Sequence, residues 1–349
     1  MIMNGQLKRC LGSIGLCLIT YFLCAQSNQS FLYESAFHQL DSLASSNGSF
    51  RKAVIITETT YDSNYTRSAD IDFNITYTIQ GIRKYLQQNH LPYRGEDSNN
   101  LNLNFAIFHF LKDTIKINTK LGEGHLSTPF TYDFNDFAGN GDWRNMFVSK
   151  LLITHLGNCH SLPYFYKILA DELGATCWLS LAPNHMYIKN RCKGGGWYNT
   201  ELTSGTFPID AWVMASGYIT LEAVQNGIYM DTLSNQQSIA LCILDLAKGY
   251  EHQAKNYYDG FIIKCCDLSL QYFPRNVQAM LLKAETLKRI YEKLDKEKNA
   301  AAKNTYSEME QLYIKLLDLG YREMPDKMYQ KWLLSIQKEK AKYNNRKVH

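Results

Sequence analysis

The sequence predicts an α+β fold in which a core of helices and antiparallel strands precedes an all-α, repeat-like C-terminal domain. Two observations lead to this prediction. Within residues 140–215, apolar residues first recur at helical spacing and then form short β-branched and aromatic runs bounded by turn residues. From residue 236 onward, one helical pattern follows another with few turn residues between them. The first pattern is typical of an α+β core and the second of a helical domain.

These patterns divide the 349 residues into four segments. We expect a signal peptide at residues 1–25 and a mixed, mostly helical region at residues 26–120. A core follows at residues 121–235, and the helical domain covers residues 236–349.

The first segment has the layout of a secretory signal. Lys8 and Arg9 precede an uncharged apolar run, and Ala25 is a small residue suited to cleavage. The apolar run is shorter than a bilayer-spanning helix. We therefore expect a secreted or periplasmic protein that is cleaved after Ala25 and has no membrane attachment after cleavage.

Charge and cysteine usage exclude other classes of protein. The formal net charge is +4 and no basic stripe is interleaved with aromatic residues, so we expect no nucleic-acid partner. Cleavage of the signal removes Cys10, Cys17 and Cys24 from a total of 9 cysteines. The remaining cysteines are spread too widely to form a disulfide framework.

Three helices are expected in the N-terminal region, because apolar residues recur at helical spacing in each. These helices cover residues 31–43, 71–88 and 101–115. A long polar and aromatic loop follows at residues 122–141. Long loops in compact domains are often functional. The aromatic residues that we consider as lining of a cleft are Tyr132, Phe134 and Phe137.

Two consecutive helices are expected at the start of the core. Asp142 is suited to cap the first, which we expect to end at Gly157. The second runs from Cys159 to Leu173, because apolar residues recur through it at helical spacing. Gly174 is its stop signal.

Three short strands follow the second helix. Their residues are 176–181, 185–189 and 197–203, rich in β-branched, aromatic and apolar side chains. Pro183 and Asn184 predict a turn between the first two strands, and the glycines at residues 194–196 predict a loop before the third.

A thiol at the start of a helix and an imidazole at the start of a strand suit nucleophilic catalysis. The thiolate is the reactive form of cysteine, and the partial positive charge of a helix N-terminus favours it. An imidazole nearby takes the thiol proton and then holds the anion. Cys159 and His185 are therefore the predicted nucleophile and base.

A third group is expected to orient the imidazole. Because strand side chains alternate between faces, pairing Lys189 with Trp197 in an antiparallel hairpin puts His185 opposite Glu201. A slip of two residues puts His185 opposite Asn199 instead. We favour Glu201, since a carboxylate also stabilises an imidazolium, and keep Asn199 as the alternative third member.

These residues resemble the transglutaminase-like superfamily, whose active site has papain-like geometry. The shared pattern is Cys at a helix start, His on the following strand, and then Trp-x-x-x-acid-x-Thr, here Trp197 to Thr203. The family usually has Asp at the acid position, so Glu201 is a departure. The resemblance implies a papain/transglutaminase-like core in which Cys159, His185 and Glu201 form a catalytic triad.

Four neighbours of these residues are further candidates for the cleft. They are Asn158, His160, Asn184 and Trp197. His160 suits a wall of the cleft better than a second base. No Cys-x-x-Cys or His-x-x-x-His spacing occurs, so we expect no metal site and no cofactor.

The C-terminal domain resembles tetratricopeptide repeats. Small residues such as Gly249, Ala279 and Ala284 are placed where paired helices approach, and Pro274 lies near a helix end. Later helices are expected at residues 306–319 and 328–338, with a solvated tail beyond. The repeats are a candidate surface for a protein partner. A plain helical bundle packed on the core is the alternative.

The sequence thus predicts cysteine-dependent acyl transfer on amide bonds, with hydrolysis of a peptide or isopeptide bond as the simplest reaction. A peptide or protein would be the substrate. Backbone N–H groups at the start of the Cys159 helix are expected to stabilise the oxyanion. The alternative is a catalytically idle transglutaminase-like domain that acts with its helical repeats as a protein- or peptide-binding module.

Overall fold

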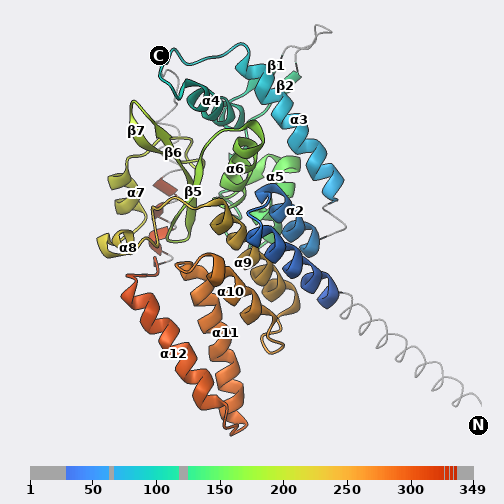
Figure 1. The fold of residues 1–349 in the computed structure, drawn as a ribbon, viewed down its shortest axis with the longest axis vertical. Coiled ribbons are helices and arrows are strands. Elements are labelled where there is room, and N and C mark those ends of the chain that lie inside the picture. The colour runs from blue at the N-terminus through green and yellow to red at the C-terminus, as the bar shows by residue number, and fades with distance from the viewer. Residues whose placement is uncertain are drawn as a thin grey trace, which may run out of the picture.

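The computed structural model describes residues 29–62, 67–117, 125–325, 327–329, 331–332 and 334–335. Within these residues the fold is mainly helical with small β-sheets, so the broad α+β prediction is confirmed (Figure 1). The predicted signal peptide and C-terminal tail lie outside the described residues. Among the residues described, no helix combines the length and apolarity needed to cross a bilayer.

The N-terminal region is helical, as predicted, but it contains a helix that the sequence analysis missed. Helices cover residues 29–45, α2 (Phe50–Tyr61), α3 (Ser68–Leu86) and α4 (Ser98–Lys112). The missed helix is α2, which begins where the Ser49 side chain accepts a hydrogen bond from the backbone of Lys52. Its buried face packs against α9 (Asn235–Ala254) of the C-terminal region.

The segment between α4 and the predicted nucleophile is less regular than expected. β1 (Ile115–Ile117) pairs antiparallel with β2 (His125–Ser127), and β3 (Thr131–Tyr132) pairs parallel with β4 (Leu156–Gly157). The predicted helix at residues 101–115 therefore ends earlier, and part of the predicted loop at residues 122–141 forms short strands.

The single helix predicted from Asp142 to Gly157 is wrong. Asp142 instead caps the 3-10 helix η1 (Trp143–Met146), and α5 (Val148–Thr154) follows after an extended Phe147. The carboxylate of Glu58 accepts the first two backbone N–H groups of α5, at 2.7 and 2.9 Å. A cap supplied by α2 therefore starts a separate helix.

Helix α6 (Ser161–Leu173) lies at the centre of the fold. Most of its residues are buried, and it packs against α3, α4, α5 and the largest sheet. It ends at Gly174, which has the left-handed φ of 76° that favours glycine. The helix begins two residues later than predicted, so Cys159 lies in the turn that leads into it.

The largest sheet has the order β5 (Trp178–Ala182), β6 (His185–Cys192) and β7 (Gly196–Thr200), all antiparallel. Both registers considered from the sequence are wrong, because Lys189 pairs with Asn199 and Arg191 with Trp197. The cause is the length of β6, which continues to Cys192 and leaves only residues 193–195 for the turn.

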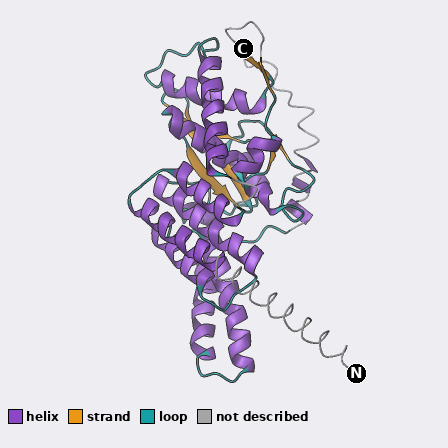
Figure 2. Ribbon diagram, turned by 90° about the vertical axis from the view of Figure 1, so that its right-hand side faces the viewer, coloured by secondary structure: helices purple, strands orange, loops and turns teal. Residues whose placement is uncertain are grey.

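Helices dominate the rest of the chain. Two short ones, α7 (Asp210–Ser216) and α8 (Leu221–Gln225), were not predicted. After α9 come α10 (Phe261–Tyr272), α11 (Val277–Lys296) and α12 (Ala302–Asp318), each packed against the one before it. The hairpin of α11 and α12 projects from the body (Figure 2). This succession agrees with the predicted helical hairpins, whereas the repeat assignment stays a prediction.

The apolar core runs across the predicted boundary at residue 236. One cluster of buried residues joins the N-terminal helices, α6 and the sheet to α9 and α10. A second cluster joins residues of the sheet, such as Tyr187, to Val277 and Met280 of α11. The C-terminal helices therefore pack as part of the same body that carries the predicted site.

Candidate active site

Cys159 is held by a turn whose centre is the side chain of Asn158. The Asn158 amide is fully buried, and its Oδ1 accepts hydrogen bonds from the backbone of His160 (2.9 Å) and Ser161 (3.2 Å). Its Nδ2 donates to the carbonyl of Phe137 at 2.9 Å. Asn158, predicted as a cleft residue, thus also fixes the backbone that follows Cys159.

His185 is positioned by the tight turn before β6. Pro183 has a restricted φ, and Asn184 adopts a left-handed φ of 53°, as the second central position of a type II turn requires. The turn also brings the Asn184 carbonyl to the nucleophile, because the Cys159 thiol lies 3.8 Å from that oxygen. The sequence predicted this turn, and it also predicted Cys159 and Asn184, which the turn brings together, as residues of the site.

Glu201 contacts the imidazole directly. Its Oε2 lies 2.6 Å from Nε2 of His185, and the two side chains are 5% and 7% exposed. The backbone N–H of Thr203 donates to the other carboxylate oxygen at 2.8 Å. Continuing the observed register puts Glu201 diagonal to His185 and not opposite it. The extra methylene of Glu, compared with Asp, suits this longer reach.

Asn199, the alternative third member, does not contact the imidazole. Its Nδ2 donates to the carbonyl of Pro208 at 3.0 Å and to Oδ1 of Asp210 at 2.7 Å. This correction follows from the register, which places Asn199 opposite Lys189 and away from His185.

The charges of the three groups stabilise one another. Burial opposes the imidazolium, but Glu201 and Cys159 outweigh burial and raise the pKa of His185 from 6.5 to about 10. Burial also opposes the thiolate, yet the neighbouring His185 lowers the pKa of Cys159 below its ordinary value. The pKa of Glu201 is lowered as well, because His185 outweighs its burial. The site therefore favours a thiolate, an imidazolium and a carboxylate.

The second imidazole nitrogen is left for the thiol. Nδ1 of His185 is buried and makes no hydrogen bond to the residues that the structure describes. Since Nε2 is engaged by Glu201, Nδ1 is the nitrogen that can exchange a proton with Cys159.

A cleft of about 380 Å³ opens beside Cys159 and His185. Its walls come from the core and from the C-terminal helices α9 and α11, and most of them are apolar. Three of the four predicted cleft residues line it, namely Asn158, His160 and Asn184. Phe137 of the predicted aromatic loop also lines it. Tyr132 and Phe134 pack against each other instead, with ring centres 4.9 Å apart.

Trp197 is a wrong prediction as a cleft residue. It is 48% exposed, lies opposite Arg191 on the hairpin, and packs against the ring of Trp178 at 5.2 Å. The longer β6 strand carries Trp197 away from the start of β6, where His185 lies.

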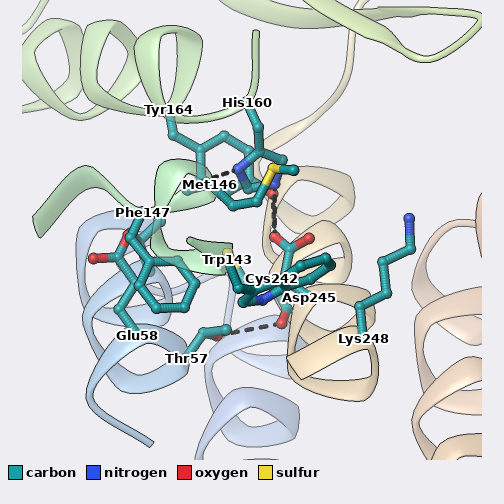
Figure 3. Close-up of a pocket in the computed structure, with 11 residues that line it drawn as sticks. Thr57, Glu58, Trp143, Met146, Phe147, His160, Tyr164, Cys242, Asp245 and Lys248 are labelled. Atoms are coloured by element: carbon teal, nitrogen blue, oxygen red, sulfur yellow. Dashed lines mark hydrogen bonds and ion pairs between the residues drawn. The ribbon is translucent and has the colours of Figure 1, made fainter. Parts of the chain in front are cut away.

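His160 also lines a smaller cavity of about 90 Å³ (Figure 3). Nε2 of His160 is 3.0 Å from Oδ2 of Asp245, a residue of α9. The hydroxyl of Tyr164 donates to the same oxygen at 2.8 Å. Sequence reasoning missed Asp245, because nothing in the local pattern marks a contact over 85 residues.

Two aromatic residues from the end of the described chain cover the site. The hydroxyl of Tyr329 lies 3.9 Å from the Cys159 sulfur. The ring of Trp332 meets the ring of His185 edge to face, at 4.9 Å between centres. Both lie within the predicted helix at residues 328–338, but their contact with the site had no signal in the sequence.

The comparisons with known proteins leave the family open. No family model, no curated protein and no solved structure matches this chain.

Proposed function

We propose that the chain is a cysteine-dependent acyl-transfer enzyme of transglutaminase-like type, whose simplest reaction is hydrolysis of a peptide or isopeptide bond. The observation that carries the proposal is the buried contact of 2.6 Å between Glu201 and His185, beside a thiol of lowered pKa. Cys159 is the nucleophile, His185 the base and acid, and Glu201 the group that orients His185. The papain-like core and the secreted or periplasmic location are parts of the same proposal.

The reaction follows from the charges at the site. The Cys159 sulfur bonds to the amide carbonyl carbon, and the C–N bond breaks as the His185 imidazolium gives its proton to the leaving amine. His185 then takes a proton from water, whose oxygen bonds to the carbonyl carbon as the C–S bond breaks. This second step returns the thiolate and the imidazolium. An amine that replaces water gives transfer in place of hydrolysis.

One backbone donor is placed for the oxyanion. The N–H groups of His160 and Ser161 already bond to Asn158, so they do not serve as the sequence analysis expected. The N–H of Cys159 itself makes no hydrogen bond to the residues that the structure describes. It is therefore the main-chain donor that this turn offers to a developing negative charge.

The cleft indicates the kind of substrate. Its walls are mostly apolar, and Cys159 and His185 are among the residues that line it. A peptide or protein segment with apolar side chains next to the reacting amide matches these walls. The cleft also supports a second candidate function, a catalytically idle peptide-binding module, because Trp332 covers His185 and leaves it 7% exposed.

Alkylation with iodoacetamide at mildly acidic pH separates the two functions. Burial raises the pKa of Cys177 and Cys266 to about 12, so these thiols are internal controls. We expect Cys159 to react first and His185→Ala to slow that reaction at least tenfold, as read by peptide mass spectrometry. In parallel, p-nitrophenyl acetate should release p-nitrophenol in a burst and leave an acetyl group on Cys159. Equal alkylation of all thiols, without acetylation of Cys159, would contradict the enzyme and favour the binding module.

A further inference from the structure

His160 lies directly after the proposed nucleophile and lines both the cleft and the smaller cavity. Both nitrogens of its ring meet acceptors. Nδ1 is 2.9 Å from the carbonyl oxygen of Met146, and Nε2 is 3.0 Å from Oδ2 of Asp245. The contact with Asp245 is drawn in Figure 3.

These partners decide the proton count of the ring. A backbone carbonyl only accepts hydrogen bonds, and so does an ionised carboxylate. A neutral imidazole has one N–H, so it would leave one of the two contacts without a proton. Asp245 also accepts the hydroxyl of Tyr164 at 2.8 Å, and this second donor favours the ionised carboxylate. Both ring nitrogens therefore donate a hydrogen bond only when His160 carries both protons.

The charged and titratable groups around His160 are Asp245, Lys248 and Cys242 of α9, Glu58 of α2, Tyr164 of α6 and Cys159. The Lys248 cation opposes a positive charge on the ring, whereas the Asp245 carboxylate favours it. Burial opposes the charge on the ring, but Asp245 outweighs burial and raises the pKa of His160 above its ordinary value. The positive charge of His160 in turn lowers the pKa of Cys159.

We infer that His160 is a second imidazolium beside the nucleophile, and that Asp245 of α9 is the residue that holds it charged. Both act as positioning residues, since their effect reaches the reacting atoms through the charge on the Cys159 thiolate. The inference rests on the proposed function and adds to it. His185 gives up its proton to the leaving amine during acylation, whereas His160, bonded on both nitrogens, keeps its charge throughout the cycle.

The test measures the rate of Cys159 alkylation by iodoacetamide between pH 4 and pH 9, with the full chain and peptide mass spectrometry. His160→Gln and Asp245→Asn each remove one charge of the pair. We expect each to move the acidic midpoint of the rate profile upward by about one pH unit, so that the rate at pH 5 falls roughly tenfold. The plateau at pH 9 should stay within about twofold, because the thiolate forms there without help. His160→Lys, which keeps the positive charge, should stay near the wild-type midpoint.

Trp143→Phe is the control, since Trp143 lines the smaller cavity and the substitution changes no charge. Its midpoint should stay within a few tenths of a pH unit of the wild type. An unmoved midpoint in His160→Gln and Asp245→Asn would overturn the inference, and so would an equal loss of rate at every pH. His185→Ala in the same assay keeps the two proposals apart. If His185→Ala moves the midpoint while the His160 and Asp245 variants do not, this inference fails and the proposed function stands.

Discussion

Replacing Glu201 with Gln removes one charge from the candidate site and keeps the size of the side chain. The surroundings of His185 raise its pKa from 6.5 to about 10. That difference corresponds to about 5 kcal/mol in favour of the imidazolium, and Glu201 is its largest favourable contributor. Breaking a buried ion pair by removal of one partner costs about 3–5 kcal/mol. We therefore expect Glu201→Gln to weaken the thiolate–imidazolium pair by about 3 kcal/mol.

Alkylation of Cys159 reports this loss. At pH 6 we expect the rate with iodoacetamide to fall roughly ten- to hundredfold in Glu201→Gln, and to recover as the pH approaches 9, where the thiolate forms unaided. Asn199→Ala is the control, because Asn199 is buried in the same sheet but bonds to Pro208 and Asp210. Its rate at pH 6 should match the wild type. A wild-type rate in Glu201→Gln, or an equal fall at pH 6 and pH 9, would refute the role of Glu201.

Two further predictions test groups near the site. Burial outweighs the hydrogen bonds from the start of α5 and raises the pKa of Glu58 from 4.5 to about 7. Its stabilising contribution is then complete below pH 4.5 and is lost as the pH rises through 7, by up to about 3 kcal/mol. Urea unfolding at pH 5 and pH 7 should show this loss in the wild type and not in Glu58→Gln; an identical change in both proteins would contradict it. Trp332→Ala should expose His185 and speed the reaction of Cys159 with a bulky maleimide several-fold. Trp197→Ala, which alters an exposed ring, should leave that rate unchanged. Equal rates in the wild type and both variants would count against a covering role for Trp332.

Local patterns in the sequence predicted the parts of the site that depend on short-range structure. The helix that ends at Gly174, the turn at Pro183 and the strand that starts at His185 each follow from residue types within a few positions. Glu201, and not Asn199, contacts His185, and the preference for Glu201 rests on a chemical reason and not on the register. A carboxylate stabilises the imidazolium of His185 from a diagonal position as well as from the position directly opposite.

The errors have one physical origin, which is that register and long-range packing are decided by contacts that local patterns do not contain. The glycines at residues 194–196 predict a loop, but the hairpin turn is only three residues long. The resulting register pairs Trp197 with Arg191 and places it away from the cleft. Glu58 and Asp245 come from helices far away in sequence. A charged residue on an amphipathic helix looks like a solvated residue until its partner is known.

The positions of α9 and α11 show how the C-terminal region relates to the candidate site. α9 supplies Asp245 to the ring beside the nucleophile, and the start of α11 forms a wall of the cleft. Tyr329 and Trp332 then lie over Cys159 and His185. A fragment of residues 121–235 would lack all of these groups, so we do not expect it to keep the reactivity of Cys159. Residues of α9 and of the start of α11 therefore complete the cleft.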